Sequence, residues 1–237
     1  LSYKNSSNSI SMGQQPINVN PLTFTVKGVS FEMVNVEGGT FDMGSNDPDA
    51  AFDAKSVHSV TLSDYSIGKT VVTQALWQVV MGNNPSNFKG DNLPIEKVSW
   101  CDCQEFIRKL NVLTGKTFRL PTEAEWEFAA KGGNKSKGYK YSGSDNIDNV
   151  AWYKDNSGNT THPVATKQPN ELGIYDMSGN VWEWCSDWYG NYDSCSQRNP
   201  YGPDSGFFFR VSRGGGWSYE TGSCGVSNRD GSDPSDR

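Results

Sequence analysis

The sequence has no long apolar segment, no block of basic residues and only 2 histidines. A membrane-spanning helix needs roughly 20 consecutive apolar residues, so we expect no transmembrane segment. The 21 Lys and Arg are outnumbered by 27 Asp and Glu, which gives a formal net charge of −6. We therefore expect no nucleic-acid partner, because phosphate backbones attract clustered basic side chains. Phosphate-loop, HExxH and nucleophile-elbow motifs are absent as well.

The chain has 5 cysteines, an odd number that leaves at least one of them unpaired within a monomer. Cys101 and Cys103 are too close together for a CxxC redox or zinc motif. Cys185 and Cys195 could close a short surface loop, so any disulfide is expected between them. Cys224 is then expected to be a free thiol.

Aromatic residues and glycine are plentiful. Aromatics make up 12% of the chain and glycines number 25, which predicts a loop-rich globular protein with a core built on large rings. Residues 1–22 are rich in Ser and Asn, so we expect a flexible leader there. Residues 23–237 contain no linker or repeat and are expected to form one domain. Because the chain starts at Leu1, we expect a processed, extracytoplasmic monomer.

Alternating apolar residues predict several strands. A strand over 22–26 is followed by a second over 29–36 whose alternation is shifted by one position, which indicates a bulge or a break at Gly28. The Gly38–Gly39 pair is expected to turn this strand back on the next one, which starts at Thr40. A further strand is expected over 60–67.

Capping residues predict helices. Ser99 with Asp102 resembles a capping box, and apolar residues at helical spacing follow until Gly115. Thr122 with Glu125 is a full capping box ahead of a helix that ends at Gly132–Gly133. A third helix is expected over 73–81.

The densest motif is the segment 173–188, GIYDMSGNVWEWCSDW. In a strand, Trp182 and Trp184 point to one face and Glu183 to the other. Asp176 and Glu183 flank a glycine turn, and carboxylates beside exposed carbonyls suit calcium, which takes six to eight oxygen ligands. The alternative is that both carboxylates accept hydrogen bonds from backbone N–H groups.

Several phrases together resemble one family. They are GGTFDMG (38–44), TQALW (73–77), NPS (84–86), VSW (98–100), RLPTEAEWE (119–127), GIYDMSGNVWEW (173–184) and RVSRGGGW (210–217). In this order they resemble the formylglycine-generating enzyme family, also called sulfatase-modifying factor domains. The resemblance implies an α+β fold, namely a variant of the C-type lectin fold with twisted antiparallel sheets, two to three helices and much irregular loop.

The resemblance also implies an activity. Enzymes of the family oxidise a cysteine of a sulfatase to formylglycine with O2, using two cysteines that hold copper(I) and have four residues between them. Here the second cysteine falls on Cys224, but Tyr219 stands at the first position. A phenol cannot replace a thiolate in a two-sulfur copper site, so copper is not expected. Iron(II) enzymes with this fold need three histidine ligands, whereas only His58 and His162 are present, and both are expected to be structural.

The family also binds structural calcium, and the resemblance assigns its ligands to this chain. One site matches Asp176, Gly179, Val181 and Glu183, and Asn149 with Val150 begins the other.

The segment from residue 217 combines Trp217 and Tyr219 with many Ser, Gly and Asp residues, a composition typical of binding surfaces. We expect a non-catalytic domain that binds a protein or small-molecule ligand through Trp217, Tyr219, Glu220, Cys224, Asn228, Arg229 and Asp230. A solvated polar loop is the alternative. Two other functions stay open: a copper oxidase with Cys224 as its catalytic residue, and a variable protein diversified by a retroelement, a group that shares this fold. Such domains continue past the position of Arg237 into a further strand.

Overall fold

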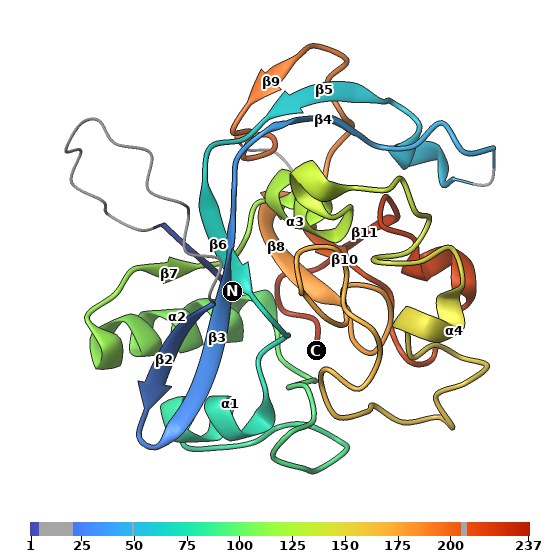
Figure 1. Cartoon of the computed structure of the whole chain (residues 1–237). Helices are drawn as coiled ribbons and strands as arrows, with labels where there is room; N and C mark the ends of the chain where they lie inside the picture. Colours follow the sequence, from blue (N-terminus) through green and yellow to red (C-terminus); the bar gives the residue numbers. More distant parts are fainter. Residues whose placement is uncertain (5–20, 49, 205–207) are drawn as a thin grey trace.

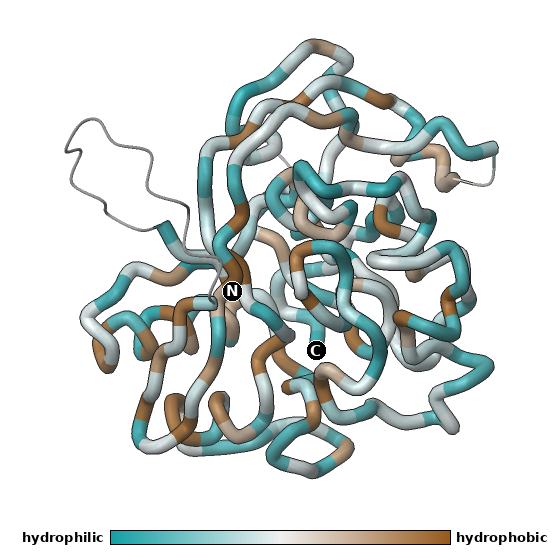
Figure 2. Tube along the Cα trace, viewed as in Figure 1, coloured by the Kyte–Doolittle hydropathy of each residue, from teal (hydrophilic) through white to brown (hydrophobic). Residues whose placement is uncertain are grey.

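The computed structural model describes residues 1–4, 21–48, 50–204 and 208–237. Three small sheets and three main helices are joined by long loops (Figure 1), so the chain is α+β as expected. No helix in the described part of the chain has the length and apolarity to cross a bilayer. Figure 2 shows apolar segments concentrated in the inner strands and in the helices that pack on them, with polar segments in the outer loops.

The largest sheet has five antiparallel strands. In order across the sheet they are β2 (Leu22–Val26), β3 (Val29–Val36), β6 (Tyr65–Gly68), β1 (Ser2–Tyr3) and β7 (Phe118–Arg119). The phase shift predicted at Gly28 is a two-residue hairpin turn, because Val26 pairs with Val29. Lys27 and Gly28 have φ values of 47° and 85°, as a tight hairpin turn of this type requires.

The start of the chain differs from the expected flexible leader. Ser2 and Tyr3 pair with both β6 and β7 and are buried, and the Ser2 hydroxyl donates to the carbonyl of Ser66 at 3.1 Å. Residues 5–20, the greater part of the expected leader, lie outside the described residues.

The other two sheets have three strands each. One contains β4 (Thr40–Met43), β5 (His58–Thr61) and β9 (Gln197–Arg198), and the other contains β8 (Glu183–Trp188), β10 (Arg210–Arg213) and β11 (Arg229–Ser232). All their pairs are antiparallel except β5 with β9.

Two strand predictions were wrong at the junction between the first two sheets. Gly38 and Gly39 do not reverse the chain, because β3 pairs with β6 whereas β4 pairs with β5. The expected strand over 60–67 is likewise divided between β5 and β6. The Gly38 N–H donates to the Asp64 carboxylate at 2.8 Å, and a Cβ at Gly38 would lie 2.4 Å from the Leu62 carbonyl oxygen. The glycine therefore lets the segment from β3 to β4 lie close against the segment from β5 to β6, where both pass from the first sheet into the second.

All three predicted helices are present. They are α1 (Gln74–Met81), α2 (Trp100–Thr114) and α3 (Glu123–Ala130). Both capping boxes form as predicted, and α2 ends at Gly115 in the left-handed conformation. Short turns of helix add α4 (Ile147–Val150), η1 (Phe52–Ala54), η2 (Gly133–Lys135) and η3 (Thr221–Cys224).

Helix α3 is buried along its whole length and carries two carboxylates that pair with arginines of the third sheet. The Arg213 guanidinium donates to the Glu127 carboxylate, and both side chains are 0% exposed. Arg229 binds Glu123 with two hydrogen bonds of 2.8 and 2.7 Å. Burial alone would raise the pKa of Glu127, but Lys131 and Arg213 hold it below its ordinary value. These pairs fix α3 against β10 and β11.

Candidate binding pocket and metal site

A surface cavity of about 370 Å³ lies where the start of β8 meets the segment after β10. Its aromatic lining consists of Trp182, Trp184, Trp217 and Tyr219, and the loop 95–98 ahead of α2 closes another side. We call it the aromatic pocket. Its volume is in the range of small-molecule or side-chain binding sites.

The rings are held by contacts with one another and with the backbone. Trp182 and Tyr219 meet edge to face with centroids 5.4 Å apart, and Trp217 meets Phe88 in the same way at 5.5 Å. The indole N–H of Trp184 donates to the carbonyl of Val98 at 3.1 Å. The pocket therefore presents ring surfaces whose positions are set before any ligand binds.

The segment that carries Trp217 and Tyr219 is fixed through its backbone. The Gly179 N–H donates to the Gly214 carbonyl at 2.7 Å, and the Trp217 N–H donates to the Asn180 carbonyl at 2.9 Å. Gly214 and Gly215 have φ values of 95° and 75°, which favour glycine. A Cβ at Gly215 would lie 2.9 Å from the Cys224 sulfur.

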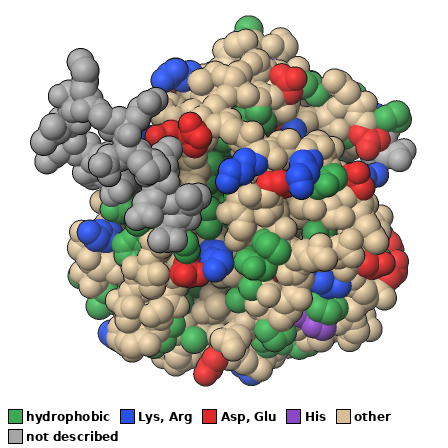
Figure 3. All heavy atoms as spheres, viewed as in Figure 1, with side chains coloured by type: hydrophobic (Ala, Val, Ile, Leu, Met, Phe, Trp, Pro, Cys, Tyr) green, Lys and Arg blue, Asp and Glu red, His purple; other side chains and the backbone are tan. Residues whose placement is uncertain are grey.

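Charged groups line the rim of the aromatic pocket. Carboxylates come from Glu96, Asp230 and Asp236, and cations from Lys97 and Arg237. Arg237 is already paired with Asp102 of α2 at 2.9 Å. Among the described residues of the lining, the three carboxylates therefore outnumber the one remaining cation, Lys97. Figure 3 shows acidic and basic side chains scattered over one face of the molecule without a large patch of one sign.

The structure brings together part of the predicted binding surface. Trp217, Tyr219 and Asp230 line the pocket. Glu220 is exposed but pairs with Lys154. Sequence reasoning missed Glu96 and the rest of its loop, because only the fold brings residues 95–98 next to residue 217.

Two of the seven predicted binding residues are buried, and a third does not line the aromatic pocket. Cys224 is fully buried, and Arg229 is 5% exposed because it pairs with Glu123. The amide of Asn228 donates to the Ser223 carbonyl, and its side chain lies outside the aromatic pocket. Alternation along β11 explains the contrast, since it turns Arg229 inward and Asp230 outward.

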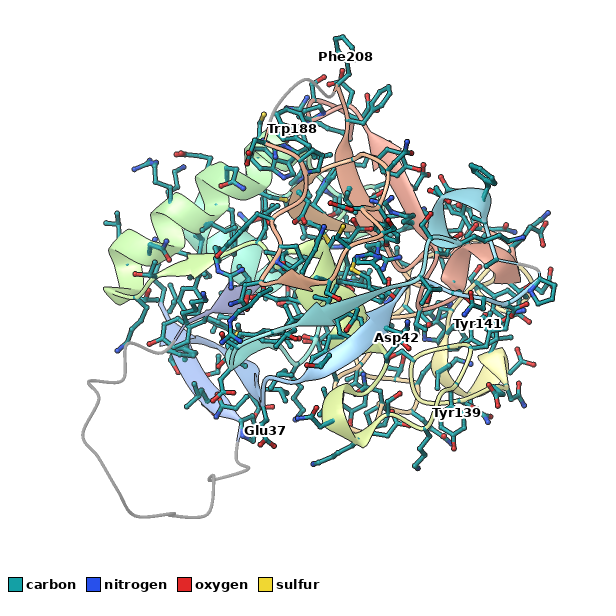
Figure 4. The ribbon with its side chains drawn as sticks, turned by 90° about the horizontal axis from the view of Figure 1, so that it is seen from above. Glu37, Asp42, Tyr139, Tyr141, Trp188 and Phe208 are labelled. Atoms are coloured by element: carbon teal, nitrogen blue, oxygen red, sulfur yellow. The ribbon has the colours of Figure 1, made fainter. Side chains whose placement is uncertain are left out.

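Cys224 is in an environment unlike that of a reactive thiol. It packs with Tyr141, Val150 and Tyr153 (Tyr141 is labelled in Figure 4). Burial raises the pKa of the thiol to about 12, against a smaller opposing effect of the Gly216 N–H. Cys224 does not line the aromatic pocket.

The expected pairing of Cys185 with Cys195 is wrong. All five cysteines are free: Cys185 is a buried core residue of β8, whereas Cys195 is exposed in the loop before β9.

Two of the predicted calcium ligands are carboxylates, of which Asp176 is buried and Glu183 half-buried. Asp176 has a left-handed φ of 60°, and one of its oxygens accepts the Ala165 N–H at 2.8 Å. Burial raises the pKa of Asp176 to about 6. Burial also raises the pKa of Glu183 to about 7, and the Asp176 carboxylate adds to this shift. Each carboxylate is thus costly to ionise.

The neighbouring carbonyls of Gly179 and Val181 accept no hydrogen bond from any described residue. Unoccupied carbonyl and carboxylate oxygens fit a hard cation such as calcium. At the second predicted site, the Asn149 carbonyl accepts the Gln168 N–H at 2.9 Å and Val150 is buried with Cys224. Across the described residues, no group of three or more His, Cys, Asp or Glu side chains could hold a metal by itself.

Known proteins with similar sequences belong to the family that the motifs resemble. The model of the sulfatase-modifying factor enzyme 1-like domain matches residues 23–237. A chaperone protein LppX of Paenibacillus barcinonensis is 38% identical, with 80% of this chain and 79% of that protein covered. The formylglycine-generating enzyme of Streptomyces coelicolor is 36% identical over 53% of this chain, but only 42% of that enzyme is covered.

Comparison with solved structures identifies the same fold. Treponema denticola variable protein 1 superposes with a TM-score of 0.82 at 35% identity, covering 91% of this chain and 94% of that one. PvdO from Pseudomonas aeruginosa has a TM-score of 0.78 at 26% identity, covering 92% and 95%. The chain therefore belongs to the sulfatase-modifying factor enzyme 1-like domain family and has the formylglycine-generating-enzyme variant of the C-type lectin fold.

Proposed function

We propose that this domain is a non-catalytic, extracytoplasmic binding module whose ligand enters the aromatic pocket. The observation that supports the proposal is that Tyr219, at the position that the resemblance assigns to the family's first cysteine, lines the pocket, whereas Cys224 is buried and does not line it. Preformed rings with an acidic rim favour an exposed segment of a protein or peptide, for which aromatic anchors supply most of the binding energy.

Peptide selection tests the proposal. A displayed library of random peptides is selected on the immobilised protein, and the enriched peptides are then measured on variants. We expect Tyr219→Ala to weaken binding at least ten-fold, because it removes a ring that is 44% exposed and therefore free to contact a ligand. Phe52→Ala is the matched control, since Phe52 is 93% exposed on η1 and does not line the aromatic pocket. Equal binding by wild type and Tyr219→Ala contradicts the proposal.

The competing function is copper-dependent oxidation, and it has a direct assay. The reduced protein is titrated with copper(I) and incubated with O2 and a Cys-containing sulfatase peptide, with the Streptomyces coelicolor enzyme as positive control. We expect neither tight one-to-one copper binding nor formylglycine, because a buried thiol with a raised pKa is a poor copper ligand. Formylglycine made by wild type and lost in Cys224→Ser would establish the oxidase instead.

A more specific form of the binding function is a variable protein diversified by a retroelement. It is favoured by the structural similarity to Treponema denticola variable protein 1 and by the composition of the pocket. A second copy of the coding segment beside the gene, differing from it only at adenines, would support this form.

Calcium is proposed as a structural ligand of the same domain. Asp176 and Glu183 would hold it together with the carbonyls of Gly179 and Val181. When bound, the ion would supply positive charge to two carboxylates that burial makes costly to ionise. The turn at Gly179 also holds the Gly214 backbone, so calcium would stiffen one support of the aromatic pocket.

A further inference from the structure

A second cavity, of about 310 Å³, lies between α3, the end of β8 and the loop that carries β9. We call it the β9 cavity; Figure 1 shows β9 beside β5 at the outer edge of the molecule. It shares no lining residue with the aromatic pocket. Its polar lining includes His58, Glu123, Asp187, Asp193 and Arg229, and Trp188, labelled in Figure 4, contributes a ring.

Asp187 supplies an acceptor that the fold leaves unused. The side chain is only 3% exposed, and its Oδ2 accepts the Glu123 N–H at 3.0 Å and the Ser186 hydroxyl at 2.9 Å. Its Oδ1 has no hydrogen bond with any described residue. This oxygen faces Gly202, another lining residue, where an added Cβ would lie 3.3 Å from it. Oδ1 is not among the fully buried polar atoms of the described residues that lack a partner, so it is open to the cavity and available to a ligand.

His58 supplies a second unused acceptor. Its Nδ1 lies 2.9 Å from the Ser56 carbonyl oxygen, which can only accept, so Nδ1 carries a proton. In the neutral form of the ring the lone pair is then at Nε2, which is not bonded to any described residue. The ring packs on Tyr192 with centroids 4.9 Å apart, so its orientation is fixed.

The charges of the lining leave the cavity negative. Arg229 is the cationic residue of the cavity lining, and its guanidinium is already paired with the Glu123 carboxylate through two hydrogen bonds. Asp187 and Asp193 have no ion-pair partner among the described residues. Arg210 and Arg119 act on Asp187 from a distance but do not line the cavity. Burial and the Glu123 carboxylate raise the pKa of Asp187 to about 7, and a bound cation would offset that cost.

We propose that the β9 cavity binds an organic cation, an alkylammonium or alkylguanidinium group, through Asp187 Oδ1 and His58 Nε2. Both groups accept hydrogen bonds, and such cations carry several donors. The Trp188 and Tyr192 rings line the same cavity, but arginines already stack on them, Arg210 at 3.5 Å and Arg229 at 4.1 Å, so the proposal rests on the two acceptors. A metal ion is disfavoured, because the described residues contain no metal-binding cluster of three or more His, Cys, Asp or Glu. The same group could belong to a free amine or to a Lys or Arg side chain.

Calorimetric titration of the intact protein tests this inference. The probes are n-butylammonium and n-butylguanidinium chloride as free cations, acetyl-Gly-Lys-Gly-amide and acetyl-Gly-Arg-Gly-amide as side-chain mimics, and n-butanol as a neutral control. We expect saturable binding of at least one cationic probe and at least ten-fold weaker binding to Asp187→Asn. In that variant the carbonyl oxygen can keep the two hydrogen bonds of Oδ2, while an NH₂ group replaces the free acceptor.

Asp155→Asn makes the same chemical change at an exposed residue that lines neither cavity and should leave binding unchanged. Asp230→Asn tests whether the probes bind in the aromatic pocket instead. Binding of the free cations assigns the cavity to small amines, and binding of the peptides alone assigns it to a protein side chain. The inference is overturned if no cationic probe binds, if n-butanol binds as tightly, or if Asp187→Asn binds equally well. It is also overturned if Asp230→Asn rather than Asp187→Asn weakens binding. Thermal unfolding of each variant confirms that it is folded.

Discussion

Replacing Arg213 by Ala is expected to lower the free energy of unfolding by about 3 to 5 kcal/mol, the range found when one partner of a buried ion pair is removed. Arg213 is fully buried, and its guanidinium donates to Glu127 and to the Asn228 carbonyl. It also lies 5.2 Å from the centre of the Trp126 ring. Removing it leaves a buried carboxylate with Lys131 as its remaining ionic partner.

The matched control is Arg108→Ala. Arg108 pairs with Glu105 at 2.7 Å, but its side chain is 64% exposed, and exposed pairs contribute less than about 1 kcal/mol. Urea denaturation of the three proteins measures the difference. Similar losses for Arg213→Ala and Arg108→Ala would show that the buried pair does not hold α3 against the third sheet. Arg213→Lys should fall between the two, because it keeps the charge but loses the planar pair of donors.

Calcium is expected to raise the free energy of unfolding by about 2.7 kcal/mol at a concentration one hundred times its Kd. The stabilisation follows because the native fold gathers the oxygens of Asp176 and Glu183, whereas the unfolded chain does not. Thermal unfolding is compared with excess calcium and with EDTA. We expect a higher Tm with calcium for wild type and no response for Glu183→Gln.

Glu220→Gln is the control for this measurement. It makes the same chemical change at an exposed residue on the surface, so its response to calcium should match that of wild type. The calcium proposal is refuted if wild type shows the same Tm in calcium and in EDTA. It is equally refuted if Glu183→Gln keeps the full response.

The local features of the fold could be predicted because their causes are local. Capping boxes at Ser99 and Thr122 mark the first turns of α2 and α3, and Gly115 marks the end of α2. The strand pairings near Gly38 could not be predicted, because a glycine permits both a reversal and a bend. Which one occurs depends on Asp64 and Leu62, which reach Gly38 only after the chain has folded.

In the candidate sites, too, local features could be predicted from the sequence, whereas contacts made only on folding could not. Composition pointed to Trp217 and Tyr219, which do line the aromatic pocket, but it could not separate Arg229 from Asp230, which point to opposite sides of one strand. The β9 cavity had no sequence signal, because His58 and Asp187 come from strands that are far apart in the chain. His58 was expected to be a structural hydrogen-bonding residue, and its Nδ1 does have that role.

The segment after β10 is attached to the rest of the domain by main-chain hydrogen bonds, from Gly179 to Gly214 and from Trp217 to Asn180. These bonds do not depend on which side chains residues 217–220 carry. The exposed positions 218–220 can therefore accept many different residues at little cost to folding. In the proposed binding function, the residues that determine the shape of the domain would then be separate from those that contact the ligand, and the contact residues could change on an unchanged backbone.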